Sequence, residues 1–234
     1  MKVVILQSSY IPWKGYFDLI RDADVFCFYD EVKYTKNDWR NRNKLLDKNG
    51  EFWLSIPISK EAVKKKISEV ELPGNDWQKK HYSVIMSTYY SAPQKNVLKS
   101  LLDDIYLNND WQHLSQVNQY STKRIAEYMG LKTEFKNSAS YNLDGDRINR
   151  LISLIKQIGG TEYISGPSAK NYLSGSETLF ADAGIKLSFK NYGPYAPYSQ
   201  NITSFSNHVS IIDLLMFIPQ EKVIDYLTPI NDPV

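Results

Sequence analysis

The first thirty residues place two apolar runs on either side of a helix-like segment, and this order restricts the fold. Lys2–Leu6 (KVVIL) is followed by the loop QSSYIPWKG, by the helix-like stretch YFDLIRDAD and by a second apolar run that begins at Val25. A strand, a helix and a second strand in this order form a right-handed crossover between parallel strands. The sequence therefore predicts an α/β fold: a Rossmann-like open, mainly parallel sheet with helices on both faces.

Polar and aromatic side chains follow each of these two runs, where a short turn would suffice. Because ligands of such sheets bind beyond the carboxyl ends of the strands, we expect a binding site there. The candidate residues are Gln7, Tyr10 and Trp13 after the first run, and Asp30, Tyr34, Trp39, Arg40, Asn41 and Arg42 after the second.

The rest of the chain continues to alternate between strand and helix patterns. Further strands are expected at Glu51–Ile58, Ile67–Leu72, Thr133–Lys136, Glu162–Ser165 and Lys186–Lys190. Helices are expected at Gly15–Arg21, Trp77–Tyr90, Gln94–Leu107, Trp111–Met129, Arg147–Ile158, Ala169–Leu173, Ser176–Ala183, Ser210–Phe217 and Gln220–Leu227. No repeat or long linker interrupts the pattern. We therefore expect a single domain over residues 1–234, with a mostly helical lobe at about 76–130.

The composition excludes several classes of protein. The 28 Lys and Arg residues against 26 Asp and Glu residues give a net charge of +2, too small for a dedicated nucleic-acid binder. No apolar run reaches the roughly 18–20 residues of a membrane span, so membrane insertion is not expected. The N-terminus shows no basic, apolar leader, and Cys27 is the single cysteine, which excludes an internal disulfide. We expect a cytoplasmic protein in which Cys27 is a small core residue.

The standard catalytic and nucleotide-binding signatures are absent. The chain has no G-x-G-x-x-G, no phosphate-binding G-x-x-x-x-G-K-[ST], no G-x-S-x-G and no H-E-x-x-H. Its three histidines lack the spacing of metal ligands, so no metal site is expected. Asp144 and Asp146 form a D-x-D pair of the kind that holds a metal in glycosyltransferases, but the pair directly precedes a helix, which favours a capping role. His81 has helical spacing with Trp77 and Ile85, and both a packing role and a site role stay open.

Two arginines in the segment NDWRNRNKL suit an anionic ligand. If the segment is extended, Arg40 and Arg42 face the same side. Asn41 and Asn43 then face the other side. Two guanidinium groups at this spacing match a phosphate or a carboxylate. A solvated basic loop is the alternative, and Trp39 and Trp53 nearby favour a site.

A second candidate anion site is the turn in SGPSAKNYL, which follows an expected strand and opens an expected helix. Ser165, Gly166 and Ser168 would present backbone amides and hydroxyl groups to an anion there. An ordinary capped turn between a strand and a helix is the alternative.

Seven stretches of the sequence form a recognisable set. QSSYIPWKGYF at 7–17, ADVFCFYDEVKY at 23–34 and WRNRNKL at 39–45 are specific in combination, and WLSIPI at 53–58, KKHY at 79–82, YISGPSAKNYL at 163–173 and SIIDLLMF at 210–217 accompany them. Together they resemble the WbqC-like protein family along nearly the whole chain. Family members commonly have a His-Gln-Pro-Asn run where this chain has Leu6, Gln7, Ser8 and Ser9, so no role of that histidine carries over.

The resemblance implies an enzyme of bacterial surface-polysaccharide (O-antigen) biosynthesis. Such an enzyme would be an aminoacyl (glycyl) or acyl transferase that modifies a nucleotide-linked amino sugar. Its partners would be that sugar and an amino-acid or acyl donor. His81 or Asp30 would take a proton from the attacking amine. Aromatic side chains would stack on the base or the sugar, and Arg40 and Arg42 would hold phosphate.

Two other interpretations stay open. The chain is alternatively an ATP-dependent nucleotidyl or adenylate-forming enzyme, in which case ATP is a cofactor; no motif indicates any other cofactor. It is alternatively a non-catalytic protein that binds nucleotide-linked sugars. ATP dependence separates the first two interpretations, and turnover separates the transferase from the binding protein.

Overall fold

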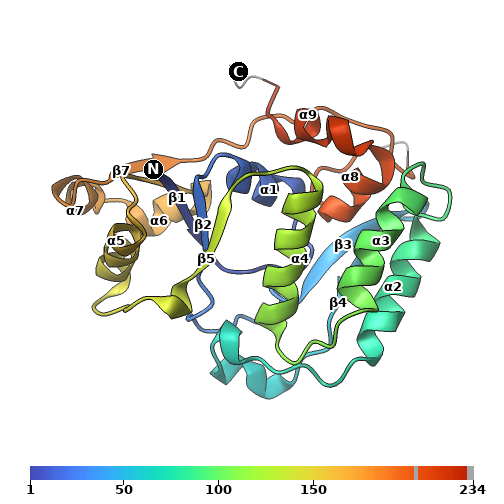
Figure 1. The fold of residues 1–234 in the computed structure, drawn as a ribbon, viewed down its shortest axis with the longest axis horizontal. Helices are drawn as coiled ribbons and strands as arrows, with labels where there is room; N and C mark the ends of the chain where they lie inside the picture. Colours follow the sequence, from blue (N-terminus) through green and yellow to red (C-terminus); the bar gives the residue numbers. More distant parts are fainter. Residues whose placement is uncertain (203–204, 231–234) are drawn as a thin grey trace.

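The computed structural model describes residues 1–202 and 205–230, and its centre is a sheet of five strands. The strand order is β5-β2-β1-β6-β7, and each neighbouring pair is parallel. The strands are β1 (Lys2–Leu6), β2 (Val25–Phe28), β5 (Glu134–Asn137), β6 (Glu162–Ser165) and β7 (Lys186–Phe189). Figure 1 shows helices on both sides of this sheet. The expected α/β class with an open parallel sheet is confirmed.

Helices cover both faces of the sheet because both faces are apolar. Successive side chains of a strand point to opposite faces. Along β1, Val4 packs into one hydrophobic core, whereas Val3 and Ile5 pack into a second. The first core includes residues of α1 (Lys14–Arg21) and α4 (Leu114–Tyr128), and the second includes residues of α5 (Arg147–Ile158), α6 (Lys170–Leu173) and α7 (Glu177–Asp182).

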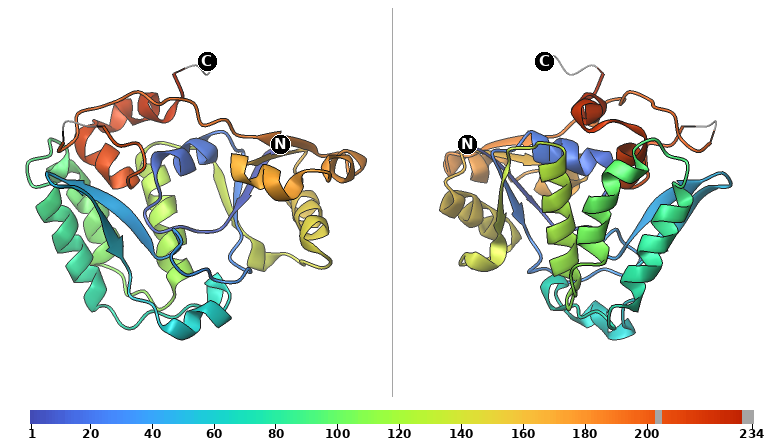
Figure 2. Two further views of the ribbon diagram at one scale, coloured as in Figure 1. Left: turned by 180° about the vertical axis from the view of Figure 1, so that it is seen from behind. Right: turned by 45° about the vertical axis from the view of Figure 1, so that its right-hand side comes forward.

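Between β2 and β5 the chain forms a hairpin and a helical lobe (Figure 2). The hairpin strands β3 (Arg42–Asp47) and β4 (Gly50–Ser55) are antiparallel and form a separate two-stranded sheet. Two 3₁₀ turns, η1 (Lys60–Lys64) and η2 (Ile67–Glu69), lead from the hairpin to α2 (Asp76–Thr88), α3 (Lys95–Tyr106) and α4. These lobe helices share the core that lies beneath α1.

Two local predictions differ from the structure. The segment Ile67–Leu72, expected to be a strand, begins with η2, because Ile67 and Val70 are both buried at a spacing of three residues, which suits a 3₁₀ turn. The sequence pattern did not identify β3, because its buried positions include the polar Asn43. By contrast, β1, β6 and α5 have the expected bounds.

After β7 the chain crosses back over α1 towards the lobe. We call this connection, residues 190–210, the strap; apart from isolated bridges, its described residues form no helix or strand. The chain then continues through α8 (Ile211–Phe217), a short 3₁₀ turn η5 (Gln220–Lys222) and α9 (Val223–Leu227). Segments far apart in the sequence therefore meet around α1 (Figure 2).

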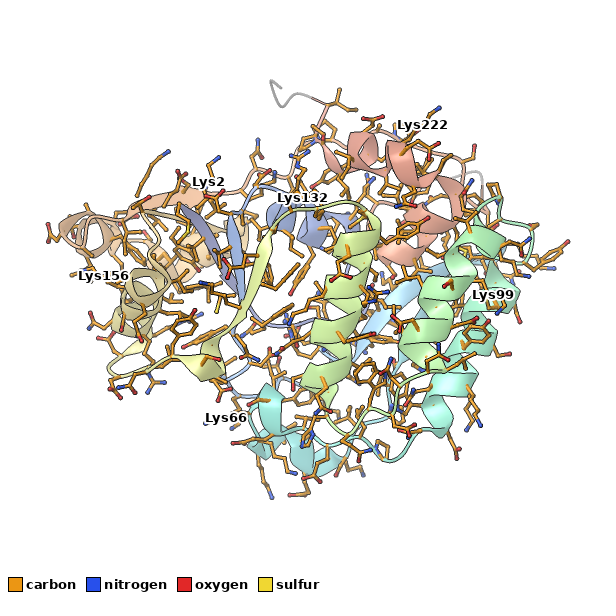
Figure 3. All side chains as sticks on the ribbon, in the orientation of Figure 1. Lys2, Lys66, Lys99, Lys132, Lys156 and Lys222 are labelled. Atoms are coloured by element: carbon orange, nitrogen blue, oxygen red, sulfur yellow. The ribbon has the colours of Figure 1, made fainter. Side chains whose placement is uncertain are left out.

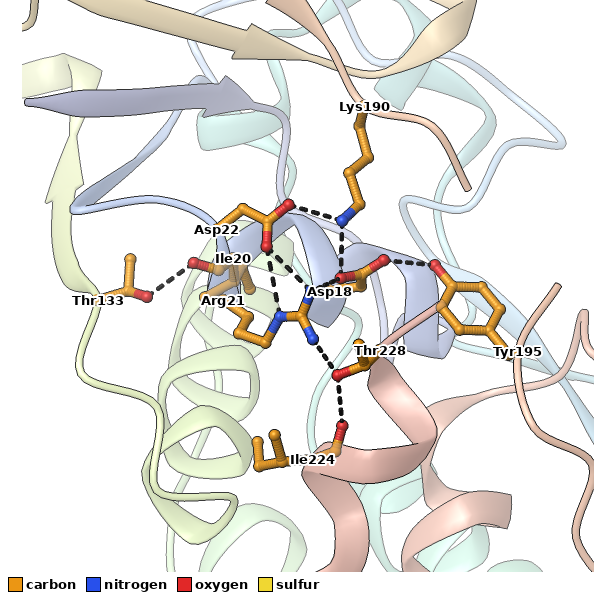
Figure 4. A network of polar contacts seen from close by, with 9 residues as sticks. All are labelled: Asp18, Ile20, Arg21, Asp22, Thr133, Lys190, Tyr195, Ile224 and Thr228. Atoms are coloured by element: carbon orange, nitrogen blue, oxygen red, sulfur yellow. Dashed lines mark hydrogen bonds and ion pairs between the residues drawn. The ribbon is translucent and has the colours of Figure 1, made fainter. Parts of the chain in front are cut away.

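Charged side chains of α1 fasten the start of the strap (Figure 4). The Lys190 ammonium lies 2.8 Å from Oδ1 of Asp18 and 2.6 Å from Oδ2 of Asp22. The Tyr195 hydroxyl donates to Oδ2 of Asp18 at 2.7 Å. Arg21 pairs with both carboxylates, at 2.9 Å and 3.1 Å. We call these five residues the α1 clamp.

Positive charge is spread over the surface. Figure 3 labels six exposed lysines in different parts of the chain: Lys2, Lys66, Lys99, Lys132, Lys156 and Lys222. No helix within the described part of the chain is long and apolar enough to span a bilayer. Cys27 is buried in β2, as expected.

Candidate functional site

A cavity of about 370 Å³ opens at the carboxyl edge of the sheet, between the loop after β1 and the turn after β6. From β1 the strand order runs through β2 and β5 in one direction and through β6 and β7 in the other. Open α/β sheets bind ligands at the point where the strand order reverses. We call the cavity at this point the switch-point cavity. It is lined by Leu6, Ser9, Pro12, Trp13, Tyr16, Leu19, Trp39, Arg40, Asn43, Gly166, Pro167, Ser168, Tyr192 and His208.

Aromatic side chains form much of the cavity wall. The Trp13 ring lies 5.2 Å from the Tyr192 ring and 5.8 Å from the His208 ring. The indole of Trp13 folds over Gly15, where a Cβ atom would lie 2.3 Å from it. Only glycine at position 15 therefore leaves room for this indole position. Flat aromatic faces with polar edges suit a ligand that contains a base or sugar rings.

The loop that carries Trp13 contains a strained residue. Ile11 is fully buried and has φ of +35°, a conformation that β-branched residues avoid. Its carbonyl accepts hydrogen bonds from Nδ2 of Asn43 at 3.0 Å and from Oγ of Ser210 at 2.7 Å. Strain of this kind costs about 1–3 kcal/mol and persists where the surroundings enforce it, often at functional sites. The loop is thus held in one shape from two distant segments.

A buried polar network supports the same loop from below. Asp30 accepts hydrogen bonds from the Ser8 amide and from Nε2 of Gln119, each at 2.8 Å. Nη1 of Arg40 donates to the Ser8 carbonyl at 2.9 Å. Burial raises the pKa of Asp30, while the hydrogen bonds from Gln119 and Ser8 oppose that rise. Asp30 does not line the cavity, and its hydrogen bond with the Ser8 amide positions the loop.

Arg40 is the cation of the switch-point cavity. Its side chain is almost completely buried, yet it contributes to the cavity wall. Its Nε makes no hydrogen bond within the described residues and lies 3.7 Å from Oδ2 of Asp38. A guanidinium with spare hydrogen-bonding capacity at a cavity wall can bind a phosphate or a carboxylate.

His81 lies in the core of the helical lobe. Its Nδ1 is 2.7 Å from the Tyr10 hydroxyl, and its Nε2 is 3.2 Å from the Ser55 carbonyl. Burial lowers the pKa of His81 to about 4, so the ring is neutral at pH 7. Since a carbonyl can only accept, Nε2–H donates to Ser55 and Nδ1 accepts from Tyr10. Tyr10 is also buried, and its hydroxyl oxygen lies 2.6 Å from the hydroxyl oxygen of Tyr106. Neither His81 nor Tyr10 lines the cavity.

The two arginines of the predicted anion site face different cavities. Arg42 lies in a second cavity of about 390 Å³, which we call the hairpin cavity; its lining residues are Tyr34, Lys36, Asn37, Asn41, Arg42, Ser55, Ile58, Ser59, Lys60 and Val63. The Arg42 guanidinium carbon lies 4.1 Å from the centre of the Trp53 ring. The expectation that Arg40 and Arg42 share one ligand face therefore does not match the structure, because the chain turns into β3 between them.

The turn after β6 contributes backbone to the switch-point cavity. Gly166 and Ser168 line it, whereas Ser165 is buried, with its Oγ 3.3 Å from the Tyr163 hydroxyl. The turn opens into a 3₁₀ turn and the short helix α6. Gln7 is half-buried, and its carbonyl accepts a hydrogen bond from Tyr16 at 3.0 Å. Asp146 caps α5, as the sequence predicted.

The sequence pattern missed several cavity residues, chiefly Tyr192 and His208 of the strap. His208 is exposed and supplies the imidazole of the switch-point cavity. A signal was present: the strap is longer than the roughly 12–15 residues above which loops without secondary structure are uncommon and usually functional. Tyr16 and Asn43 were also missed, since a tyrosine in a helix and an asparagine in a strand carry no motif.

An open depression of about 1020 Å³ lies between the strap and α8–α9, and none of its described lining residues is charged. Within residues 1–202 and 205–230, no group of three or more His, Cys, Asp or Glu side chains is arranged to hold a metal ion.

The switch-point cavity offers aromatic side chains for stacking, one buried cation, Arg40, and one exposed imidazole, His208.

Comparison with known proteins identifies the family of the chain. The sequence model of the WbqC-like protein family matches residues 7–225. The uncharacterized protein Rv1507c of Mycobacterium tuberculosis is 39% identical over 227 residues, which cover 97% of each chain. No solved structure gave a significant match.

Proposed function

The chain belongs to the WbqC-like protein family, and from that premise we propose that it transfers an aminoacyl (glycyl) or acyl unit to a nucleotide-linked amino sugar. The product would serve bacterial surface-polysaccharide (O-antigen) biosynthesis in the cytoplasm. The observation that carries the proposal is an aromatic cavity with a buried arginine at the point where α/β sheets bind ligands.

The cavity chemistry matches the parts of such a ligand. Trp13 and Tyr192 offer flat faces to a base or a sugar ring, and Arg40 offers a cation to a phosphate. A volume of about 370 Å³ lies within the usual range for small-molecule sites. Ser9 and Ser168 add hydroxyl groups at the cavity wall.

In this proposal the base is His208. The amino group of the sugar must lose a proton before or as it attacks an acyl carbon, and imidazole is the commonest group that takes such a proton. His208 is exposed in the cavity, whereas both nitrogens of His81 and both carboxylate oxygens of Asp30 already have partners elsewhere. Asp30 then acts as a positioning residue through Ser8.

Ligand binding is the first test. UDP- and dTDP-linked amino sugars are titrated into the protein while tryptophan fluorescence is followed. Arg40→Lys keeps the charge but loses the planar fork, so affinity should fall about tenfold or more, since a charge-assisted hydrogen bond contributes about 1.5–3 kcal/mol. Trp13→Phe should also weaken binding, and Trp53→Phe, outside the cavity, should not. Unchanged affinity in a folded Arg40→Lys variant contradicts the proposal.

Turnover is the second test. The protein is incubated with a nucleotide-linked amino sugar that it binds and with glycyl-tRNA, acetyl-coenzyme A or free glycine, each with and without ATP, and the products are analysed by mass spectrometry. Transfer without ATP supports the transferase. Product formation only from free glycine and ATP indicates an adenylate-forming enzyme. Binding without any product indicates a sugar-nucleotide-binding protein.

A further inference from the structure

The hairpin cavity concentrates positive charge without matching negative charge. Lys36, Arg42 and Lys60 line it, and its lining contains no aspartate or glutamate. Among the described residues, none of these three cations forms an ion pair within 4 Å. Three unpaired cations around one cavity attract a multiply charged anion more than a single carboxylate.

Neighbouring lysines outside the cavity behave differently. Lys64 pairs with Glu61 at 2.6 Å on the same 3₁₀ turn that carries Lys60. Lys65 pairs with Glu71 at 3.3 Å, and Lys44 pairs with Glu51 at 2.7 Å on the hairpin itself. Several lysines close to the cavity thus have carboxylate partners, whereas the three cations that line it have none among the described residues.

Arg42 is held in place for binding. Its guanidinium stacks on Trp53, and Nη2 donates to the Asn37 carbonyl at 2.6 Å. Its Nε is buried and has no hydrogen-bond partner within the described chain. Stacking on an indole fixes the plane of the fork and leaves its edge for hydrogen bonds, which is the arrangement that recognises phosphate.

Two exposed tryptophans connect the hairpin cavity with the switch-point cavity. Trp39 and Trp53 are 42% and 44% exposed, and their rings lie 5.3 Å apart. Trp39 lines the switch-point cavity, and Trp53 stacks under Arg42 of the hairpin cavity. The two cavities are thus neighbours across one aromatic pair, as the sites of two substrates of a transfer reaction must be.

We propose that the hairpin cavity is a second binding site, specific for a diphosphate or similarly multiply charged phosphate group. Resting on the proposed function, this site would hold the phosphate-bearing part of the activated donor, while the nucleotide-linked sugar occupies the switch-point cavity. Arg42 supplies the planar fork, and Lys36 and Lys60 supply point charges.

Inorganic pyrophosphate tests the site without knowledge of the donor. Its affinity is measured by calorimetry for the intact protein and for Arg42→Met and Lys60→Met. Each substitution should weaken binding about tenfold, and Arg42→Lys should recover only part of the loss. Lys64→Met is the matched control, because it removes the same charge from the same 3₁₀ turn outside the cavity lining.

Three outcomes overturn the proposal. They are a failure of pyrophosphate to bind, a loss of affinity in Lys64→Met as large as in Lys60→Met, and competition between pyrophosphate and the nucleotide-linked sugar. The last result would mean one extended site instead of two. Pyrophosphate binding that depends on Arg42 while no nucleotide-linked sugar binds would sustain this site and contradict the proposed function instead.

Discussion

At the scale of single residues, Lys14 is the least expected feature of the molecule. It begins α1, is 3% exposed, and its Nζ has no hydrogen-bond partner in the described residues. The ammonium lies 4.8 Å, 5.4 Å and 5.1 Å from the ring centres of Tyr195, Tyr198 and Phe205. Burial lowers the pKa of Lys14 to about 8, and the Asp213 carboxylate opposes that change. The strap rings thus stabilise a charge that burial disfavours.

Lys14→Met should therefore change the pH dependence of stability. The unfolded chain keeps the Lys14 proton up to a pKa of 10.5, whereas the folded chain releases it near 8. Unfolding takes up a proton between these values, so raising the pH stabilises the wild type relative to the variant, by at most about 3 kcal/mol. Denaturant unfolding at pH 7, 8, 9 and 10 measures the difference. A difference that does not vary with pH contradicts the prediction.

The two histidines should respond oppositely to the same substitution. His81→Asn leaves the buried Tyr10 hydroxyl without its acceptor and should cost about 1–3 kcal/mol of stability, with ligand affinity retained. His208→Asn alters an exposed side chain and should change stability by no more than about 0.5 kcal/mol, but it should abolish most turnover. The melting temperatures and single-turnover rates of the two variants show which histidine stabilises the fold and which takes part in turnover. A stable, inactive His81→Asn variant would instead make His81 the base.

Local rules brought some of the predicted site residues to one place. Trp13, Trp39 and Arg40 line the switch-point cavity, because side chains after parallel strands gather at one edge, and their role in substrate binding stays a prediction. For His81, the helical spacing with Trp77 could not distinguish a packing role in the core from a role in the site, because both roles are compatible with that spacing. His208 joins the cavity through the path of the strap, which no local pattern specifies.

At the scale of elements, the site depends on α1 and the strap together. The first turn of α1 carries Lys14 and Gly15, and its later residues Asp18 and Arg21 belong to the α1 clamp (Figure 4). The strap begins at the clamp, supplies Tyr192 and His208 to the cavity, and ends at Ser210, which holds the Ile11 carbonyl and caps α8. Loosening either end of the strap should therefore disturb one wall of the cavity.

Lys190→Met tests the clamp. The substitution removes the buried partner of Asp18 and leaves only Arg21 and Tyr195 to compensate. Breaking a buried pair on one side costs about 3–5 kcal/mol, and the remaining partners should reduce this to about 2–4 kcal/mol. Asp18→Asn in the same chain should restore part of the loss, because the uncompensated buried charge is then gone.

The control for this variant is an exposed pair. Lys64→Met breaks the ion pair with Glu61 on the surface and should change stability by less than about 1 kcal/mol. Chemical denaturation of the three variants and the wild type gives the comparison. Equal effects of Lys190→Met and Lys64→Met would show that the clamp contributes no more than a surface ion pair.

At the scale of the whole molecule, the sequence predicted the elements better than their arrangement. Asp146 and Gly159 mark the ends of α5 by local capping, so its bounds followed directly. The placement of β6 beside β1, which creates the switch-point cavity, depends on pairing across most of the chain. The sequence pattern indicated β4 but not its hairpin partner β3, because the buried side of β3 includes Asn43, a polar residue that binds the Ile11 loop.

The same long-range contacts predict a single cooperative unfolding transition. Backbone hydrogen bonds join Ser210 to Lys44 and Ile211 to Pro12, each at 2.9 Å, so the hairpin, the first loop and α8 are linked. Leu102 of the lobe belongs to the core that covers one sheet face, and Leu154 of α5 belongs to the core on the other. The helical lobe therefore has no separate core with which to melt independently.

Leu102→Ala and Leu154→Ala test this cooperativity from the two sides of the sheet. Both side chains are fully buried, and each substitution should cost about 2–5 kcal/mol. If the chain is one cooperative unit, each variant shows one transition at a lower temperature, with equal calorimetric and van't Hoff enthalpies. Circular dichroism, which reports mainly the helices, and tryptophan fluorescence should then give coincident curves. An early transition seen only in Leu102→Ala, with loss of helix before the sheet melts, would instead make residues 76–130 a separate folding unit.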